Sequence, residues 1–145
     1  MYLKRKIYDR LTQWKKESSL TLEVTGARQV GKTYIINKFA DEHFCKKIYI
    51  NLFEDSGNEF LECLRRARDW EPGQERPEKP IHKALELFDK DFTDERDTVV
   101  IIDEIQESSA VYNLIREFTR SFQCRFIVTG SYLGRILNAD FKLSA

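Results

Sequence analysis

The stretch Gly26-Ala27-Arg28-Gln29-Val30-Gly31-Lys32-Thr33 decides the fold, because it matches the pattern G-x-x-x-x-G-K-[ST] at every fixed position. Leu20, Leu22 and Val24 precede it in alternation with polar residues, and this pattern predicts a strand that leads into the stretch. Apolar residues at helical spacing follow it, and they predict a helix over 32–44. A glycine-bearing turn between a strand and a helix is the context of a phosphate-binding loop.

Each fixed position of the loop has a chemical reason. Gly26 and Gly31 let the backbone curl with its N–H groups inward, where side chains would obstruct it. The helix that follows directs its positive dipole end at the anion. Lys32 is expected to reach the β- and γ-phosphates, and the Thr33 hydroxyl to ligate Mg²⁺. The expected nucleotide-binding residues are Gly26, Ala27, Arg28, Gln29, Val30, Gly31, Lys32, Thr33 and Tyr34. For Arg28 and Gln29, an outward-facing loop side chain and a nucleotide contact remain equal alternatives.

A second motif follows the apolar run 98–102, which ends in Asp103-Glu104. A continuous apolar run predicts a strand buried on both faces of a parallel sheet. We expect Asp103 to hold Mg²⁺, usually through a water, and Glu104 to polarise the attacking water as a general base. Two adjacent acids also occur in ordinary turns, but their pairing with a complete phosphate loop favours the functional interpretation.

A third signal is the end of the strand predicted over 126–128, which leads into Thr129-Gly130-Ser131. A polar residue here is placed to bond the γ-phosphate or to position the water. Of the two hydroxyl residues we favour Thr129, which lies nearer the end of the strand. The alternative is a plain turn that uses the backbone freedom of Gly130.

The remaining pattern alternates strands and helices. Helices are predicted over 3–16, 60–67, 81–88 and 111–122, a strand over 48–50, and a last helical turn over 133–137. The segment 71–80 holds all three prolines and predicts an exposed loop. This order predicts an α/β three-layer fold with a mainly parallel sheet.

Composition narrows the function classes. The 145 residues suit one domain, and 24 basic residues balance 24 acidic ones, so no global charge favours nucleic acid or a membrane surface. No stretch has the length of a membrane span. The three cysteines, Cys45, Cys63 and Cys124, are odd in number and widely spaced, which favours buried, reduced thiols in a cytoplasmic protein. A zinc site at Cys45 and His43 has poor support, because no second ligand pair has suitable spacing.

Three motifs together resemble the AAA-superfamily ATPases. They are the phosphate loop, Ile102-Asp103-Glu104-Ile105-Gln106, and Val128-Thr129-Gly130-Ser131. More narrowly, they look like a group of bacterial and archaeal predicted ATPases with this core at the N-terminus and a largely uncharacterised domain after it. The resemblance implies ATP as the nucleotide, Lys32 and Thr33 as Walker A ligands, and Asp103 and Glu104 as the Walker B pair. It also implies Thr129 as sensor 1, on a strand between those of the phosphate loop and Asp103.

The same resemblance sets an expectation about completeness. The group's fuller architecture adds a fifth strand, further motifs and a C-terminal domain, and none of these is expected in the sixteen residues (145 − 129) that follow Thr129. We therefore expect residues 1–145 to be an N-terminal P-loop ATPase core, with its core over 20–137, truncated after the fourth strand. An arginine finger is unassigned: Arg116, Arg120 and Arg135 are candidates by position, and solvated surface arginine is the favoured interpretation of each.

Two functions compete on these observations. The first is Mg²⁺-dependent ATP hydrolysis that drives a conformational change in a partner or in the missing domain, and a protein partner or self-association is the expected interaction. The second is a nucleotide-dependent switch that hydrolyses little, as this fragment alone is expected to do. Glu104 favours the first, since a pure binding module needs no base there. A P-loop kinase is a weaker third, because no arginine-bearing lid is evident; Arg76 in the proline-rich loop is not placed over the site.

Overall fold

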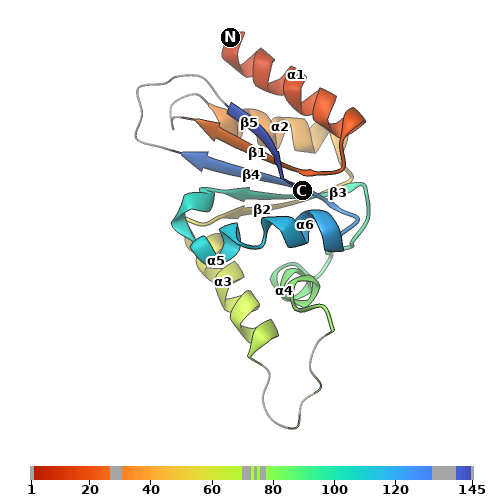
Figure 1. Cartoon of the computed structure of the whole chain (residues 1–145), viewed down its shortest axis with the longest axis vertical. Coiled ribbons are helices and arrows are strands. Elements are labelled where there is room, and N and C mark those ends of the chain that lie inside the picture. Colours follow the sequence, from red (N-terminus) through yellow and green to blue (C-terminus); the bar gives the residue numbers. More distant parts are fainter. Residues whose placement is uncertain are drawn as a thin grey trace.

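The computed structural model describes residues 2–26, 31–69, 73, 75, 78–131 and 140–144, and it contains a five-stranded sheet in the order β2-β3-β4-β1-β5 (Figure 1). The strands are β1 (Thr21–Gly26), β2 (Lys46–Asn51), β3 (Thr98–Asp103), β4 (Arg125–Ser131) and β5 (Asp140–Ser144). The first four run parallel, so their carboxyl ends share one edge of the sheet. β4 lies between β1 and β3, as the resemblance implied.

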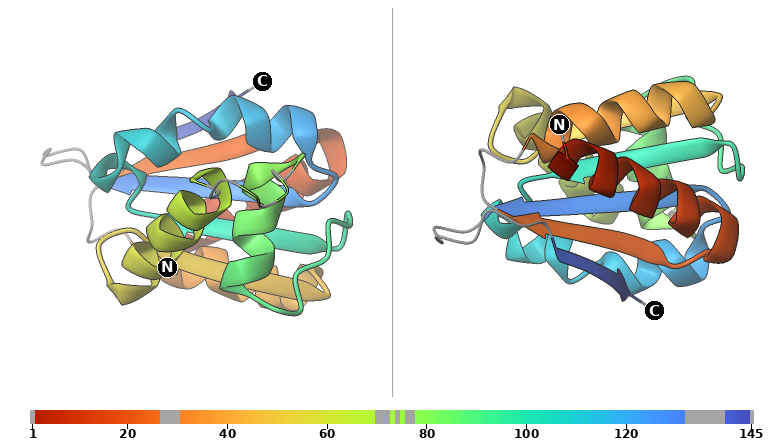
Figure 2. Two further views of the ribbon diagram at one scale, coloured as in Figure 1. Left: turned by 90° about the horizontal axis from the view of Figure 1, so that it is seen from below. Right: turned by 90° about the horizontal axis from the view of Figure 1, so that it is seen from above.

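Helices cover both faces of the sheet, which makes three layers (Figure 2). α1 (Tyr2–Glu17) and α2 (Lys32–His43) pack on one face. The other face carries α3 (Asp55–Arg68), α4 (Pro80–Phe88), the 3₁₀ helix η2 (Ile105–Glu107), α5 (Ser109–Tyr112) and α6 (Ile115–Ser121). The predicted α/β three-layer fold with a mainly parallel sheet is therefore confirmed.

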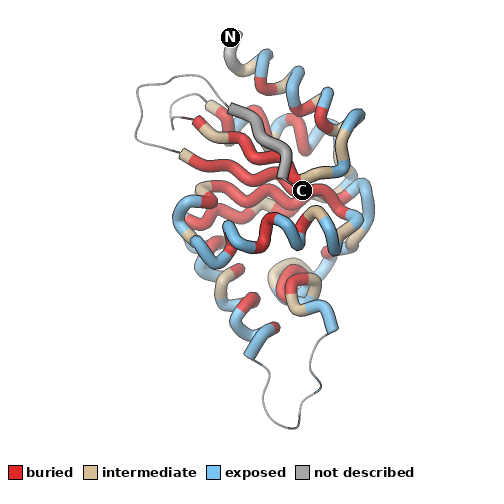
Figure 3. The backbone as a smooth tube through the Cα atoms, viewed as in Figure 1, coloured by how far each residue is buried: buried red, intermediate tan, exposed pale blue. Residues whose placement is uncertain are grey.

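The period-two geometry of β3 divides the core between these layers. Val99 and Ile101 pack towards α1 and α2, whereas Val100 and Ile102 pack towards α3 to α6. Every residue of β3 is buried, as expected for a strand covered on both faces, and the burial follows the central strands in Figure 3. The sheet edge at the carboxyl ends is thereby fixed by packing on two sides.

Two sequence-based expectations are wrong in detail. The helix expected over 111–122 is two helices, because Leu114 N bonds to Val111 O and Leu114 takes φ −90° and ψ −3°, which ends α5 before α6 begins. A strand does follow Thr129: β5 pairs antiparallel with β1, contrary to the expectation that no fifth strand fits. The helical turn expected over 133–137 and most of the 71–80 loop lie outside the described residues.

The C-terminal end of α1 is held by a buried cation. The guanidinium of Arg125 lies 4.3 Å from the ring centre of Trp14 and donates hydrogen bonds to the backbone oxygens of Lys15 and Ser18. Burial, together with the nearby charge of Arg96, lowers the pKa of Arg125. The contact fixes α1 against the start of β4, and the expected amphipathic helix over 3–16 is confirmed.

The cysteines and helices bear on two further expectations. Cys63 and Cys124 are buried, but Cys45 is exposed, because it lies in the turn between α2 and β2. The expectation that all three thiols are buried is therefore wrong for Cys45.

In the described part of the chain, no helix combines the length and apolar character that a membrane span requires.

Candidate functional site

The carboxyl ends of β1, β3 and β4 place the three sequence motifs together. β1 ends at Gly26, the first residue of the phosphate-loop motif, and α2 begins at Lys32, within the same motif. Thr33 Oγ1, in the first turn of α2, donates a 2.8 Å hydrogen bond to Asp103 Oδ2 at the end of β3. The two residues expected to hold Mg²⁺ are therefore in direct contact, although 70 residues separate them in the chain.

Lys32 is buried at 2% exposure, and its ammonium reaches across to the end of β4. Lys32 Nζ donates a 2.8 Å hydrogen bond to Ser131 Oγ. The Ser131 hydroxyl in turn donates to Glu104 Oε1 at 2.9 Å. Ser131 thus joins the residue expected to bind phosphate to the residue expected to act as base.

Thr129 is completely buried and faces Asp103 instead of the open edge. Its hydroxyl donates to Asp103 Oδ1 and accepts a 3.2 Å hydrogen bond from Glu104 N. Thr129 therefore fixes the Asp103 carboxylate and the backbone that follows it. Among the two hydroxyl residues at the end of β4, Ser131 is the one that contacts Lys32 and the carboxylate of Glu104.

Glu104 has a left-handed backbone conformation, with φ 59° and ψ 50°. For a residue other than glycine such a conformation costs on the order of 1–2 kcal/mol. Backbone strain of this kind is common at functional sites, where the surrounding contacts hold it in place. Here the backbone N–H donates to Asp103 Oδ1 at 3.0 Å, and the carboxylate is held by Ser131 and Gln106.

Gln106 links the Glu104 carboxylate to the backbone at the end of β4 by hydrogen bonds. Its side-chain amide donates to Glu104 Oε2, and its Oε1 accepts from Ser131 N at 3.2 Å. A Cβ on Gly130 would lie 3.5 Å from Gln106 Oε1, which is ordinary contact, so this turn does not depend on glycine for space. The carboxylate of Glu104 is thereby directed along the edge of β4.

Tyr49 is a site residue that the sequence analysis missed. From β2 its hydroxyl donates a 2.6 Å hydrogen bond to Asp103 Oδ2, the same oxygen that Thr33 contacts. Burial and the bond to Asp103 raise the pKa of Tyr49 well above its ordinary value. Asn51 supports it with a 3.3 Å bond from Nδ2 to the phenol oxygen. The available signal was Tyr49 within the predicted strand 48–50, with Asn51 directly after it.

The remaining predicted residues divide into two groups. Tyr34 is 62% exposed in the first turn of α2, with Lys4 Nζ lying 4.8 Å from its ring centre. Arg116 and Arg120 are exposed on α6, in agreement with surface arginine. Four positions of the loop (Ala27, Arg28, Gln29 and Val30), Arg76 and Arg135 lie outside the described residues.

The chemistry of the donors fits Mg²⁺. Thr33 supplies a hydroxyl and Asp103 a carboxylate, and hard oxygen donors are what this ion prefers. Over the residues that the structure describes, no three His, Cys, Asp or Glu side chains cluster as a metal cage. Mg²⁺ commonly binds through one or two protein oxygens and completes its shell with waters and phosphate oxygens. Thr33 and Asp103 are the residues that would hold it.

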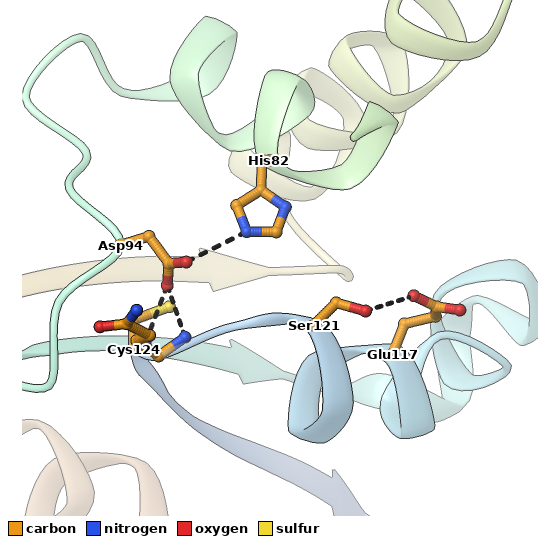
Figure 4. Close-up of polar contacts among 6 residues, drawn as sticks. His82, Asp94, Glu117, Ser121 and Cys124 are labelled. Carbon is orange, nitrogen blue, oxygen red and sulfur yellow. Dashed lines mark hydrogen bonds and ion pairs between the residues drawn. The ribbon is translucent and has the colours of Figure 1, made fainter. Parts of the chain in front are cut away.

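A separate cleft of about 410 Å³ lies between α4 and α6. In Figure 4 His82 of α4 points to Asp94, at 3.1 Å, and Asp94 accepts from Cys124 N just before β4. The His82 ring also stacks on Phe122 with 3.7 Å between ring centres. These contacts lie at the amino ends of the parallel strands, whereas Asp103 lies at their carboxyl ends. They hold α4 against the core.

Comparison with known proteins identifies one family. Residues 18–142 match the family described as AAA domain. The matched range contains every motif residue discussed above, whereas α1 lies outside it. No curated protein matches the chain.

Proposed function

The chain belongs to the AAA domain family, and from that membership together with the geometry of the site we propose that it binds ATP with Mg²⁺ and hydrolyses the γ-phosphate bond. A nucleotide-binding role follows from the family. Hydrolysis, and a conformational change driven by it, are the proposal. The observation that carries it is the 2.8 Å contact between Thr33 and Asp103, with Lys32 and Glu104 joined through Ser131 beside it.

Each side chain has a distinct part in the proposed reaction. Lys32 offers a positive charge from a buried position, where its attraction for phosphate is screened less than at the surface. Thr33 and Asp103 hold the cation, which when bound would neutralise charge on the β- and γ-phosphates. Glu104 accepts the proton of the attacking water, and Ser131 fixes one oxygen of its carboxylate.

A nucleotide-dependent switch with little hydrolysis is the second candidate, and one observation favours it. Both carboxylate oxygens of Glu104 take part in hydrogen bonds, from Ser131 and from Gln106. Two of the roughly four lone-pair positions of this carboxylate are then used by protein donors, which restricts where a water can approach it. A slow enzyme that signals by its bound state is consistent with that arrangement.

Two substitutions separate these functions. Glu104→Gln should keep ATP affinity within about twofold and reduce phosphate release by roughly 10²–10⁴-fold, the usual contribution of a general base. Glu107→Gln, an exposed glutamate on η2, is the matched control. Equal release from wild type and Glu104→Gln contradicts the base assignment, and tight binding without release by the wild type supports the switch.

Lys32→Ala tests nucleotide binding itself. The variant should lose at least about tenfold in ATP affinity by calorimetry, because a buried cation that contacts phosphate is removed. Lys38→Ala, an exposed lysine on the same helix, serves as the control. Unchanged affinity in Lys32→Ala removes the phosphate-binding assignment. Labelled γ-phosphate that appears on an acceptor other than water indicates a kinase instead.

A further inference from the structure

The carboxylate of Asp103 is surrounded by hydrogen-bond donors from four parts of the chain. Its Oδ2 accepts from Thr33 Oγ1 at 2.8 Å and from the Tyr49 hydroxyl at 2.6 Å. Its Oδ1 accepts from Glu104 N at 3.0 Å and from the Thr129 hydroxyl. An ionised carboxylate has about four lone-pair positions, two on each oxygen. Protein donors therefore use the full acceptor capacity of Asp103.

A metal-bound water that donates to Asp103 must take the place of one of these donors. Glu104 N is backbone, and Thr129 is completely buried between β1 and β3, so neither can withdraw without disturbing the sheet. Thr33 can keep its proton on Asp103 while the lone pairs of its oxygen face a cation. Tyr49 is the remaining donor, and rotation of its side chain breaks no contact of the sheet backbone.

The direction of the Tyr49 bond is fixed by Asn51. Asn51 Oδ1 accepts from Phe53 N at 2.9 Å, which leaves the amide nitrogen to face the phenol. That nitrogen donates to the phenol oxygen at 3.3 Å, so the proton of the phenol is directed to Asp103. Asn51 is also the register partner of Asp103 across the β2–β3 pair, whereas Tyr49 pairs with Ile101 and reaches Asp103 through its long side chain.

We propose that Tyr49 is a positioning residue that competes with a metal-bound water for Asp103 Oδ2, and that it thereby limits how strongly Mg²⁺ tightens nucleotide binding. The inference rests on the proposed function, with Asp103 holding the cation through a water as the sequence analysis expects. Tyr49 acts only through Asp103. Its hydroxyl donates to the carboxylate and keeps it oriented towards Thr33. The metal-bound water replaces this hydroxyl as the donor to Oδ2.

Tyr49→Phe tests this by removing one oxygen and leaving the ring in the sheet. The quantity measured is the coupling ratio, defined as the Kd for ATP in EDTA divided by the Kd in saturating Mg²⁺. The ratio should rise about three- to tenfold in the variant, the value of one net hydrogen bond. The Kd in EDTA should stay within about twofold of wild type, which also shows that the variant is folded. Tyr8→Phe is the matched control, since its hydroxyl also donates to a carboxylate, that of Glu42 on α2.

Two further results complete the test. Asn51→Ala should raise the coupling ratio less than Tyr49→Phe, because the phenol loses its fixed direction but keeps its proton. An unchanged or smaller ratio in Tyr49→Phe overturns the inference while leaving ATP binding by the wild type intact. A wild type that binds no ATP, or binds it with no effect of Mg²⁺, refutes the proposed function itself.

Discussion

Replacement of Thr129 by valine should lower the free energy of unfolding by about 2 kcal/mol, even though the side chain keeps its shape. Thr129 has no exposed surface. Valine matches its volume and its branching at Cβ, so packing between β1 and β3 is retained. The change removes one hydroxyl, which donates to Asp103 Oδ1 and accepts from Glu104 N.

The size of this loss in stability depends on the hydrogen bonds that Glu104 N and Asp103 keep in the valine variant. Glu104 N still has Asp103 Oδ1 at 3.0 Å, so this N–H is not left without an acceptor. Asp103 keeps donors from Thr33, Tyr49 and Glu104. The loss is thus one hydrogen bond to a charged group, about 1.5–3 kcal/mol, without the added cost of an unpaired buried group. For a chain of 145 residues this corresponds to a Tm lower by roughly 5–10 °C.

Thermal and urea unfolding of Thr129→Val and Thr129→Ser measure this directly. Serine keeps the hydroxyl and removes one methyl group, which should cost about 1 kcal/mol. Valine is therefore expected to be the less stable of the two. A valine variant as stable as the wild type, or more stable than the serine variant, refutes the view that Thr129 acts through its bond to Asp103.

Two other perturbations test the fold around the site. Gly57→Ala should destabilise by about 3 kcal/mol or more, because the added Cβ would lie 2.5 Å from Asn51 O, which is backbone and cannot move aside; urea unfolding that shows wild-type stability contradicts this. For Asp94, burial raises the pKa, but backbone N–H bonds, chiefly from Cys124, and the bond from His82 outweigh it, so the folded pKa is lowered. Its stabilisation is present above the unfolded pKa of about 3.9 and is lost as the pH falls through the lower folded value. Asp94→Asn should therefore be less stable than wild type by about 1–3 kcal/mol at pH 7, and the difference should shrink in acid-unfolding curves below about pH 4; a difference independent of pH counts against the assignment.

The fold was largely predictable because its strands carry strong periodic signals. The unbroken apolar run of β3 predicted a strand covered on both faces, and every one of its residues is buried. The break between α5 and α6 was not predictable, since Val111 and Phe118 lie on one buried stripe whether or not the helix is continuous. β5 was not predicted because its five residues contain only two apolar positions in alternation.

The site was predictable where a motif fixes the spacing, and less so where only the tertiary fold brings residues together. Lys32, Thr33, Asp103 and Glu104 come from motifs, and the fold brings all four to one edge. Tyr49 has no motif, because its contact with Asp103 depends on the pairing of β2 with β3. The sequence likewise did not show which hydroxyl residue of β4 has which role. Thr129 is buried against Asp103 of the neighbouring strand, whereas Ser131 lies at the end of β4.

Thr129 and Ser131 therefore have different roles, although they belong to one sequence motif at the end of β4. Thr129 is buried on Asp103, so it can fix the carboxylate but cannot respond to a ligand without disturbing the sheet. Ser131 lies at the end of the strand between Lys32 and Glu104, and both bonds use its single hydroxyl oxygen. A phosphate that draws Lys32 towards itself changes what that oxygen must satisfy, and so changes how firmly Glu104 is held. A ligand can shift such an equilibrium only by the difference in its interaction with the two arrangements, and the Lys32–Ser131 bond is one contact that such a shift would change. In the proposed function, two hydrogen bonds through Ser131 therefore connect the phosphate-binding lysine to the base.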